Sequence, residues 1–156
     1  MLFSNKKYKL NDYEYLEFKL LNRVNIDVQK KEITRAINRI EGHMVTKATN
    51  QNLKNKLGEL YLREGEYAKA GKHFYFKVIK TSEEIEAVNI FKKKYGNDPT
   101  IILKNLISKE SFKVTDLSLF AKKKINLLIT QINKEQNIIP NFLKGIKAHL
   151  DKVLPS

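Results

Sequence analysis

The chain has 156 residues, with 30 basic and 17 acidic side chains and a net charge of +13. It contains no cysteine, which excludes disulfides and thiolate chemistry and favours a reducing compartment, so we expect a cytoplasmic protein. The sequence has no run of about 18 apolar residues, and its first twenty residues lack the apolar stretch of a secretory signal, so neither a membrane span nor a cleavable leader is expected. A chain of this length can bury a core of its own, and we expect residues 1–156 to form a single domain.

Apolar residues recur at helical spacing along most of the sequence, which predicts an all-α protein. Asn11 and Glu14 have the spacing of a capping box and begin a helix expected to end near Val24. Part of that segment also alternates as a strand would. Asp27 is expected to cap a second helix that ends near Met44. The residues expected to face inward from these two helices are Tyr13, Leu16, Leu20, Val24, Ile33, Ala36, Ile37 and Ile40.

Two helices are expected in the next part of the chain, separated by a glycine turn. The third covers residues 50–63 and ends before Gly65, and the fourth runs from Glu66 to about Lys80. The third is expected to bury Leu53, Leu57, Leu60 and Tyr61.

The fifth and sixth helices have the clearest boundaries. Thr81 and Glu84 form a capping box, and Gly96 ends the helix that they begin. Asp98 caps the sixth helix, with proline at its first position, and this helix is expected to end near Ser108. The residues expected to face inward are Ile85, Val88, Phe91, Tyr95, Ile102, Leu103 and Leu106.

A loop is expected at 109–114, followed by a seventh helix that begins at Thr115 or Asp116. An eighth begins at Pro140, with Gly145 as a weak point in its interior. The residues expected to face inward from the last two helices are Leu117, Ala121, Ile125, Leu128, Ile132, Phe142, Leu143, Ile146, Leu150 and Val153.

Residues 57–74, LGELYLREGEYAKAGKHF, resemble the tetratricopeptide repeat, a helix–turn–helix unit. Gly58 and Ala70 are small where two antiparallel helices would approach closely, and Gly65 permits the turn. Lys54 and Lys77 depart from the usual pattern. The matching positions are Leu57, Gly58, Tyr61, Gly65, Tyr67, Ala70 and Phe74.

The chain is also similar to small uncharacterised bacterial proteins with this arrangement. Weaker echoes of the motif extend the resemblance to residues 28–99. It implies an irregular tetratricopeptide-like stack of about eight helices, in which the helices of 99–154 pack on the 28–99 core.

No pattern in the sequence predicts catalysis. His43, His73 and His149 lack a histidine or carboxylate at the four-residue spacing of a helical metal site. Phosphate-binding glycine loops and nucleophile elbows are missing from the sequence too. We therefore expect a protein that is not an enzyme, with no catalytic residue, no metal and no cofactor.

A stack of this kind implies a surface that holds a peptide or a partner domain. The partner is expected to be another protein, of acidic character, because of the net positive charge. The most concrete version is an immunity or antitoxin protein that neutralises a cognate toxin in the bacterial cytoplasm. The residues expected to contact the partner are Lys54, Arg63, Lys69, Lys72 and Lys77.

The alternative is a lysine-rich nucleic-acid-binding protein. Two lysine triplets, at 92–94 and 122–124, would form an anion-facing ridge through Lys92, Lys93, Lys122 and Lys123, unless they are simply solvated. The aromatic run at 73–76 lies between lysines, as in sites that stack single-stranded bases. Against this alternative, only four of the basic residues are arginine, the side chain best suited to clamp phosphates and read bases.

Overall fold

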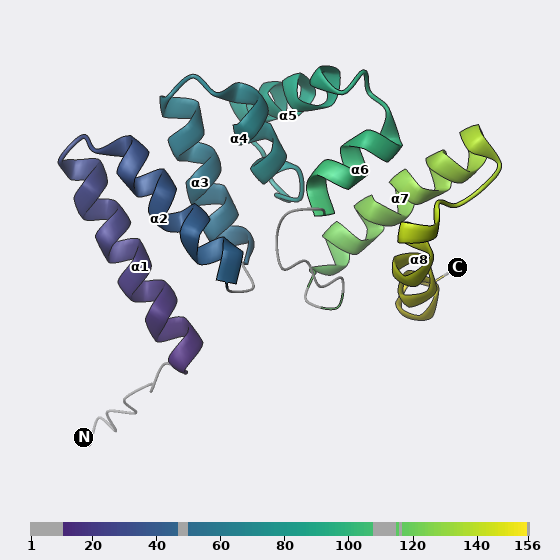
Figure 1. Cartoon of the computed structure of the whole chain (residues 1–156), viewed down its shortest axis with the longest axis horizontal. Coiled ribbons are helices and arrows are strands. Elements are labelled where there is room, and N and C mark those ends of the chain that lie inside the picture. Colours follow the sequence, from purple (N-terminus) through teal and green to yellow (C-terminus); the bar gives the residue numbers. More distant parts are fainter. Residues whose placement is uncertain (1–10, 47–49, 108–114, 116, 156) are drawn as a thin grey trace, which may run out of the picture.

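The computed structural model describes residues 11–46, 50–107, 115 and 117–155. The loop expected at 109–114 and Asp116 lie outside these residues. The described part forms eight helices and no strand, which confirms the all-α class (Figure 1). None of these helices is both long and apolar enough to cross a membrane. The helices are α1 (Asp12–Gln29), α2 (Ile33–Thr46), α3 (Gln51–Arg63), α4 (Tyr67–Phe74), α5 (Ser82–Lys94), α6 (Pro99–Ile107), α7 (Leu119–Gln136) and α8 (Asn141–Val153).

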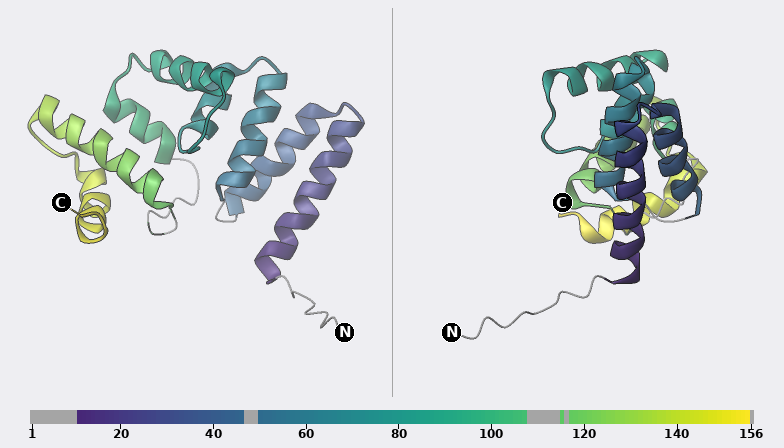
Figure 2. Two further views of the ribbon diagram at one scale, coloured as in Figure 1. Left: turned by 180° about the vertical axis from the view of Figure 1, so that it is seen from behind. Right: turned by 90° about the vertical axis from the view of Figure 1, so that its left-hand side faces the viewer.

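The helices follow one another along a curved stack. Most pack against their neighbours in the chain: α1 against α2, α2 against α3, α3 against α4, α4 against α5, α6 against α7 and α7 against α8. Helices α1 and α8 lie at opposite ends of the arch (Figures 1 and 2). This arrangement agrees with the irregular stack of about eight helices expected from the sequence.

The first helix begins as predicted but ends later. The Glu14 amide donates to Asn11 Oδ1 at 2.8 Å, and the Asn11 amide donates to the Glu14 carboxylate at 3.0 Å. The expected cap at Asp27 is wrong, because Asp27 lies in the last turns of α1 with a buried side chain. Its carboxylate forms an ion pair with Arg39 of α2, and this charged partner takes the place of the backbone amides that the carboxylate would bind as a cap.

The hairpin of α3 and α4 has the packing that its motif predicts. Asn50 caps α3, and Gly65 turns the chain with a φ of +74°. A Cβ on Gly58 would lie 2.7 Å from the Phe74 ring, so only glycine fits there. Helix α4 ends at Phe74, six residues before the expected Lys80. The chain leaves the helix there because the next two side chains, Tyr75 and Phe76, are buried in a second core.

Helix α5 has the predicted capping box and most of the predicted inner face, since Phe91 is buried and Val88 and Tyr95 pack against the core. Thr81 Oγ1 accepts from the Glu84 amide at 3.2 Å, and Gly96 has a φ of +62°. Ile85, expected to face inward, is exposed, and Glu84 is buried in its place. The reason is that α5 turns Ala87 toward α4, where a Cβ on Gly71 would lie 2.0 Å from the Ala87 carbonyl oxygen.

The last three helices mostly follow the prediction. Asp98 caps α6 by accepting from the amides of Thr100 and Ile101. Helix α7 begins after Ser118, which accepts from the Ala121 amide at 3.1 Å, and not at Thr115 or Asp116 as expected. Leu117 therefore packs on the core from outside the helix. In α8, Leu143 and Leu150 are buried, as expected, whereas Phe142 and Val153 are exposed.

The buried side chains form two clusters that meet at α5. The N-terminal core contains Val24, Ala36, Ile37, Ile40, Met44, Leu53, Leu57, Leu60, Tyr61, Ala70, Phe74 and Ala87. The C-terminal core contains Tyr75, Phe76, Phe91, Ile102, Leu103, Leu106, Ala121, Ile125, Leu128, Ile129, Ile132, Leu143 and Leu150. Val88 packs against both. The single domain expected from the chain length stays a prediction.

The contact between α4 and α5 yields a stability prediction. Gly71→Ala is expected to lower the free energy of unfolding by roughly 1–3 kcal/mol, because the added methyl group pushes two backbones apart. Gly42→Ala is the matched control, since a Cβ at that helical glycine meets nothing within 4 Å. It is expected to stabilise the fold by roughly 0.5–1 kcal/mol. Urea unfolding of both variants measures the difference, and equal effects would show that the close approach is not required.

Candidate binding site

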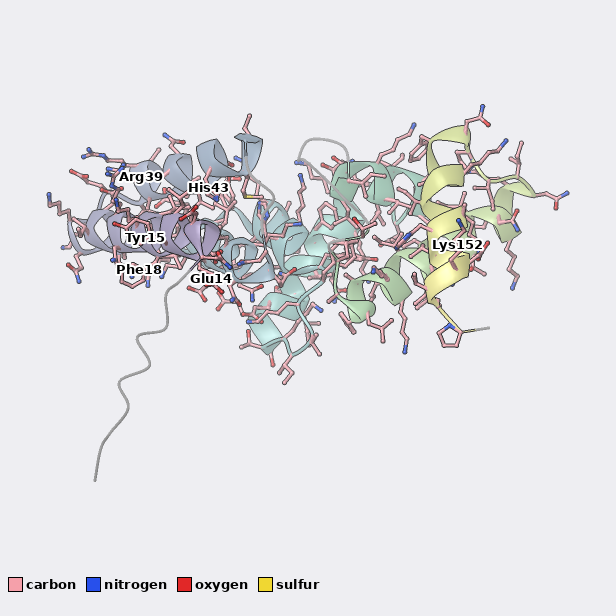
Figure 3. The ribbon with its side chains drawn as sticks, turned by 90° about the horizontal axis from the view of Figure 1, so that it is seen from below. Glu14, Tyr15, Phe18, Arg39, His43 and Lys152 are labelled. Carbon is pink, nitrogen blue, oxygen red and sulfur yellow. The ribbon has the colours of Figure 1, made fainter. Side chains whose placement is uncertain are left out.

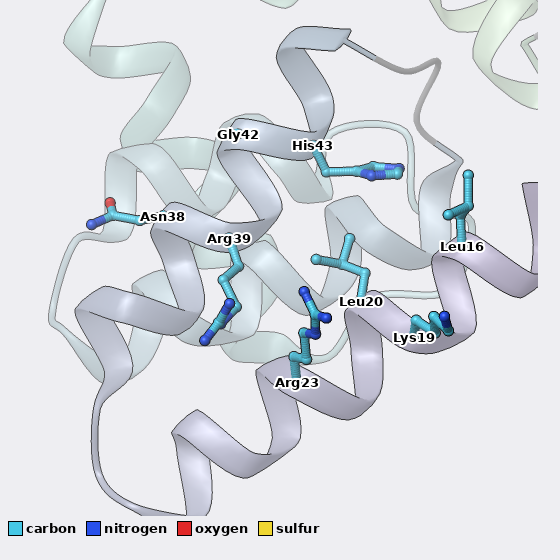
Figure 4. A pocket seen from close by; sticks show the side chains of 8 residues that line it. All are labelled: Leu16, Lys19, Leu20, Arg23, Asn38, Arg39, Gly42 and His43. Carbon is cyan, nitrogen blue, oxygen red and sulfur yellow. The ribbon is translucent and has the colours of Figure 1, made fainter.

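A groove of about 550 Å³ lies between α1 and α2 (Figure 4). Each helix supplies four of its lining residues. The lining residues are Leu16, Lys19, Leu20, Arg23, Asn38, Arg39, Gly42 and His43. Lysine, arginine and histidine are among them, but aspartate and glutamate are not.

Local sequence explains why these side chains share one groove. Leu16, Leu20 and Arg23 are separated by four and three residues, which places them on one face of α1. Gly42 leaves open space on α2, because it has no side chain. Leu20 and Arg23 of α1 and the side chains of Arg39 and His43 of α2 project into the space between the two helices (Figure 4).

An ion pair under the groove fixes one of its cations. Arg39 Nε donates to Asp27 Oδ2, and Arg35 Nε lies 3.8 Å from Asp27 Oδ1. The hydrogen bond from Arg39, with the positive charges of Arg39, Arg35 and Lys30, lowers the pKa of Asp27 against the opposing effect of burial. Asp27 is therefore ionised in the fold, and it holds the Arg39 side chain in place.

Two other cations in the groove have no acidic partner among the described residues. Arg23 makes neither a hydrogen bond nor an ion pair with any residue that the structure describes. Lys19 Nζ lies 4.6 Å from the centre of the Tyr15 ring. A guanidinium with unused donors can clamp a carboxylate through two parallel hydrogen bonds. The groove can therefore receive a negatively charged group at Arg23.

Apolar side chains lie beside these charges. Leu16 lines the groove and is 46% exposed, whereas Phe18, 55% exposed, does not line it. Viewed from below, Tyr15 and Phe18 lie at the same end of the molecule as Arg39 and His43 (Figure 3). Because the groove combines cations with the side chains of Leu16 and Leu20, it suits a ligand that is both acidic and apolar.

Three of the residues predicted from the motif lie around a buried ring pair. Tyr61 and His73 stack with ring centres 5.8 Å apart and planes at 3°. Lys69 Nζ lies 5.4 Å from the centre of the Tyr61 ring. Burial lowers the pKa of His73 to about 3, and the positive charges of Lys72 and Lys54 add to this effect.

The predicted contact residues do not share one site. Lys69 lines a pocket of about 240 Å³ together with Glu41, Glu64 and Glu66, whose carboxylates would repel an acidic partner. Arg63 is exposed in the last turn of α3. Lys77 Nζ lies 2.5 Å from Glu84 Oε1 and 5.5 Å from the centre of the Phe74 ring. None of the five predicted contact residues (Lys54, Arg63, Lys69, Lys72 and Lys77) lines the groove between α1 and α2.

The lysine triplets divide between a pocket and the surface. Lys92 and Lys124 line a pocket between α5 and α7, whereas Lys93 and Lys123 are exposed and Lys122 is half-buried. The sequence prediction therefore missed Lys124. The rings of Phe74, Tyr75 and Phe76 are all buried, so these aromatic side chains are not available to stack on bases.

The structure thus defines an all-α helical stack with a basic groove at its N-terminal end. A family model matches residues 17–144, and the chain therefore belongs to DUF6584, a family of unknown function. The matched range includes every residue that lines the groove except Leu16. No curated protein and no solved structure shows a match to the chain. In the described part of the chain, no group of three or more histidine, aspartate and glutamate side chains is arranged to hold a metal ion.

Sequence reasoning missed the groove, although a signal for it was present. Arg23, Arg35 and Arg39 are three of the four arginines of the chain, and all lie on α1 and α2. The misplaced start of the second helix hid their relation, because Asp27 was assigned to a cap. The salt bridge joins Asp27 to Arg39, twelve residues later in the sequence. It can be anticipated only when Asp27 is placed inside α1.

Buried His73 predicts a pH-dependent stability. The folded state keeps His73 neutral down to about pH 3, while the unfolded chain takes up a proton near pH 6.5. Because the unfolded state binds more protons between these values, lowering the pH is expected to destabilise the fold by at most about 1.4 kcal/mol per pH unit.

The His73→Phe variant keeps an aromatic ring beside Tyr61 and removes this titration. Urea unfolding between about pH 6.5 and about pH 5 is expected to show a smaller loss of stability for the variant than for the unchanged chain. Equal pH dependence in the two proteins would contradict the burial of a neutral His73.

The Asp27–Arg39 pair predicts a second loss of stability on acidification, at lower pH than that of His73. Because the pKa of Asp27 is lowered from 3.8, its contribution to stability is present above that pH and is lost as the pH falls through the lower folded value. Asp27→Asn is expected to be less stable than the unchanged chain at about pH 6, with a difference that shrinks toward about pH 2.

The control for this prediction is Asp151→Asn. Asp151 accepts from Lys147 at 2.6 Å on an exposed face of α8, where an ion pair contributes little. Urea midpoints at both pH values are expected to separate the two variants. If Asp151→Asn were as destabilising as Asp27→Asn at about pH 6, the Asp27–Arg39 pair would stabilise the fold no more than an exposed pair does, which would contradict the prediction.

Proposed function

We propose that the protein is a non-catalytic binding module that holds an acidic segment of another protein in the groove between α1 and α2. The observation that carries this proposal is the lining of the groove, which presents Lys19, Arg23 and Arg39 without an acidic lining residue. A cleft whose charges share one sign raises the local concentration of a ligand of the opposite sign. The partner is thus expected to be acidic, in line with the charge of the whole chain.

The groove also supplies apolar contacts and a suitable size. Its volume of about 550 Å³ is within the usual range for ligand pockets. Leu16 and Leu20 offer contacts for an apolar side chain of the partner, while Arg23 receives a carboxylate. We infer that the bound segment alternates acidic and large apolar residues.

We further propose that the α3–α4 hairpin is a tetratricopeptide-like unit. The glycine at Gly58 against Phe74, the turn at Gly65 and the buried Ala70 support this reading. In this proposal the hairpin is the scaffold against which α2 packs, and α1 with α2 forms the binding end. An immunity or antitoxin role in the bacterial cytoplasm would use the same surface, and it stays a prediction that no observation on the molecule tests.

Nucleic-acid binding stays the alternative prediction. The buried aromatic run removes its stacking version, which leaves the exposed lysines of the two triplets as the basis for contact with phosphates. Such binding would fall steeply with salt. An electrophoretic mobility shift with single-stranded DNA at two salt concentrations tests this alternative. A shift at low salt would favour it, and no shift would remove it.

The proposed groove is tested with a fluorescein-labelled peptide of alternating glutamate and leucine, by fluorescence anisotropy. Arg23→Gln is expected to weaken binding by roughly tenfold, the equivalent of one charge-assisted hydrogen-bonded pair. The matched control is Arg63→Gln, which makes the same chemical change at an exposed position of α3.

The two arginines separate the groove from the surface predicted from the sequence motif. If Arg63→Gln weakened peptide binding and Arg23→Gln did not, the partner would bind along α3. The proposal that it binds in the groove would then be wrong. Unchanged affinity in both variants would also contradict the proposal. A peptide of alternating lysine and leucine is expected not to bind.

A further inference from the structure

A second pocket, of about 390 Å³, lies near the middle of the stack. The segment between α4 and α5 turns toward the beginning of α7 (Figures 1 and 2), and both line this pocket together with α5. Its lining residues are Tyr75, Val78, Lys80, Ile85, Val88, Asn89, Lys92, Phe120 and Lys124. None of them lines the groove between α1 and α2.

Three lysines from three elements meet in this pocket. Lys80 Nζ and Lys124 Nζ each lie 5.7 Å from the centre of the Phe120 ring, and Lys124 Nζ lies 5.9 Å from the centre of the Tyr75 ring. Ring faces attract ammonium groups, so Phe120 and Tyr75 help to hold these two cations at the pocket, and Lys80 Nζ also donates to the Lys77 carbonyl oxygen. Lys92 lines the same pocket from α5.

The positive charge in the pocket has no counter-ion among its lining residues. Burial lowers the pKa of Lys80, and the positive charge of Lys124 lowers it further. Glu84 acts in the opposite direction on Lys80, but its carboxylate is bound by Lys77 at 2.5 Å. A bound anion would relieve the repulsion between the ammonium groups.

The rest of the pocket is apolar. Val88 and Ile85 line it from α5, and Val78, 65% exposed, lines it from the preceding segment. A ligand for this site therefore needs a compact region of strong negative charge next to an apolar body. A phosphate monoester has both, because at neutral pH it carries about two negative charges on three oxygens that accept hydrogen bonds.

We propose that this pocket binds a phosphate monoester with an apolar organic part, the phosphoryl group being held by Lys80, Lys92 and Lys124. The apolar part lies against Ile85 and Val88. Lysine binds phosphate as a point charge, and three such charges from separate elements surround the group without a fixed fork. This site is independent of the groove proposed above for an acidic partner.

Isothermal titration calorimetry with three anions tests the chemical class. Phenyl phosphate is expected to bind more tightly than inorganic phosphate, which lacks the apolar part. Benzoate, with a single charge, is expected to bind more weakly than phenyl phosphate. If benzoate bound as tightly as phenyl phosphate, or if phenyl phosphate did not bind, the proposal would be overturned.

Each lysine triplet provides its own control. Lys92→Gln and Lys124→Gln are each expected to weaken the binding of phenyl phosphate by about tenfold. Lys93→Gln and Lys123→Gln remove the same charge from the adjacent, exposed position and are expected to leave affinity within about twofold. Because Lys92 and Lys124 lie on different helices, a folding defect in one variant leaves the other as the test. Equal losses at adjacent positions would show a diffuse charge effect and overturn the site.

An experiment with lipid vesicles distinguishes a soluble phosphate ester from a lipid headgroup as the ligand. Sedimentation of the protein with vesicles that contain phosphatidic acid is expected to show no loss of binding in Lys92→Gln relative to Lys93→Gln, because the proposal assigns the pocket to a soluble ester. If vesicles were bound through Lys92 and phenyl phosphate were not bound, a membrane surface would be the ligand and the proposal would be wrong.

Discussion

The backbones of α4 and α5 meet at Gly71 and Ala87, and the placement of α5 between the two cores depends on this contact. A side chain at Gly71 would lie 2.0 Å from the Ala87 carbonyl oxygen, so no other residue permits the approach. The contact fixes the rotation of α5, which gives Ala87 to the N-terminal core and Phe91 to the C-terminal core. It thereby sets where α7 can pack, and with it the pocket that Lys92 and Lys124 share.

Features written into short stretches of sequence were predictable, and features that depend on contacts between helices were not. The caps at Asn11, Thr81 and Asp98 and the turn at Gly65 follow from local chemistry, and all are present. The boundary between α1 and α2 was wrong because Asp27 has two uses, and only the distant Arg39 decides between them. On α5 only the inward position of Ile85 was wrong, because the close approach of Gly71 and Ala87 turns Ile85 to the surface. Both candidate sites combine side chains from separate elements, which no single motif reveals.

The two sites differ in the kind of cation they present. The groove at the end of the stack is rich in arginine, whose planar fork suits carboxylates, and its Arg39 is fixed by a buried aspartate. In the pocket near the middle, the cations are all lysines, and two of them lie over aromatic rings. The cations behind the net charge of +13 are therefore partly gathered in these two sites and partly solvated on the surface. The groove and the pocket share no lining residue, so one protein has room for both an acidic protein segment and a small phosphate ester.

Both proposals place an anionic ligand at a defined position, one in the groove and one in the pocket. Backbone amide shifts in a two-dimensional NMR titration test this, with the acidic peptide and phenyl phosphate added in turn. We expect the peptide to shift amides of α1 and α2, phenyl phosphate to shift those around Lys80, Lys92 and Lys124, and the two sets not to overlap. Shifts spread over the exposed lysines of every helix, or centred on α3 and α4 for both ligands, would contradict this expectation.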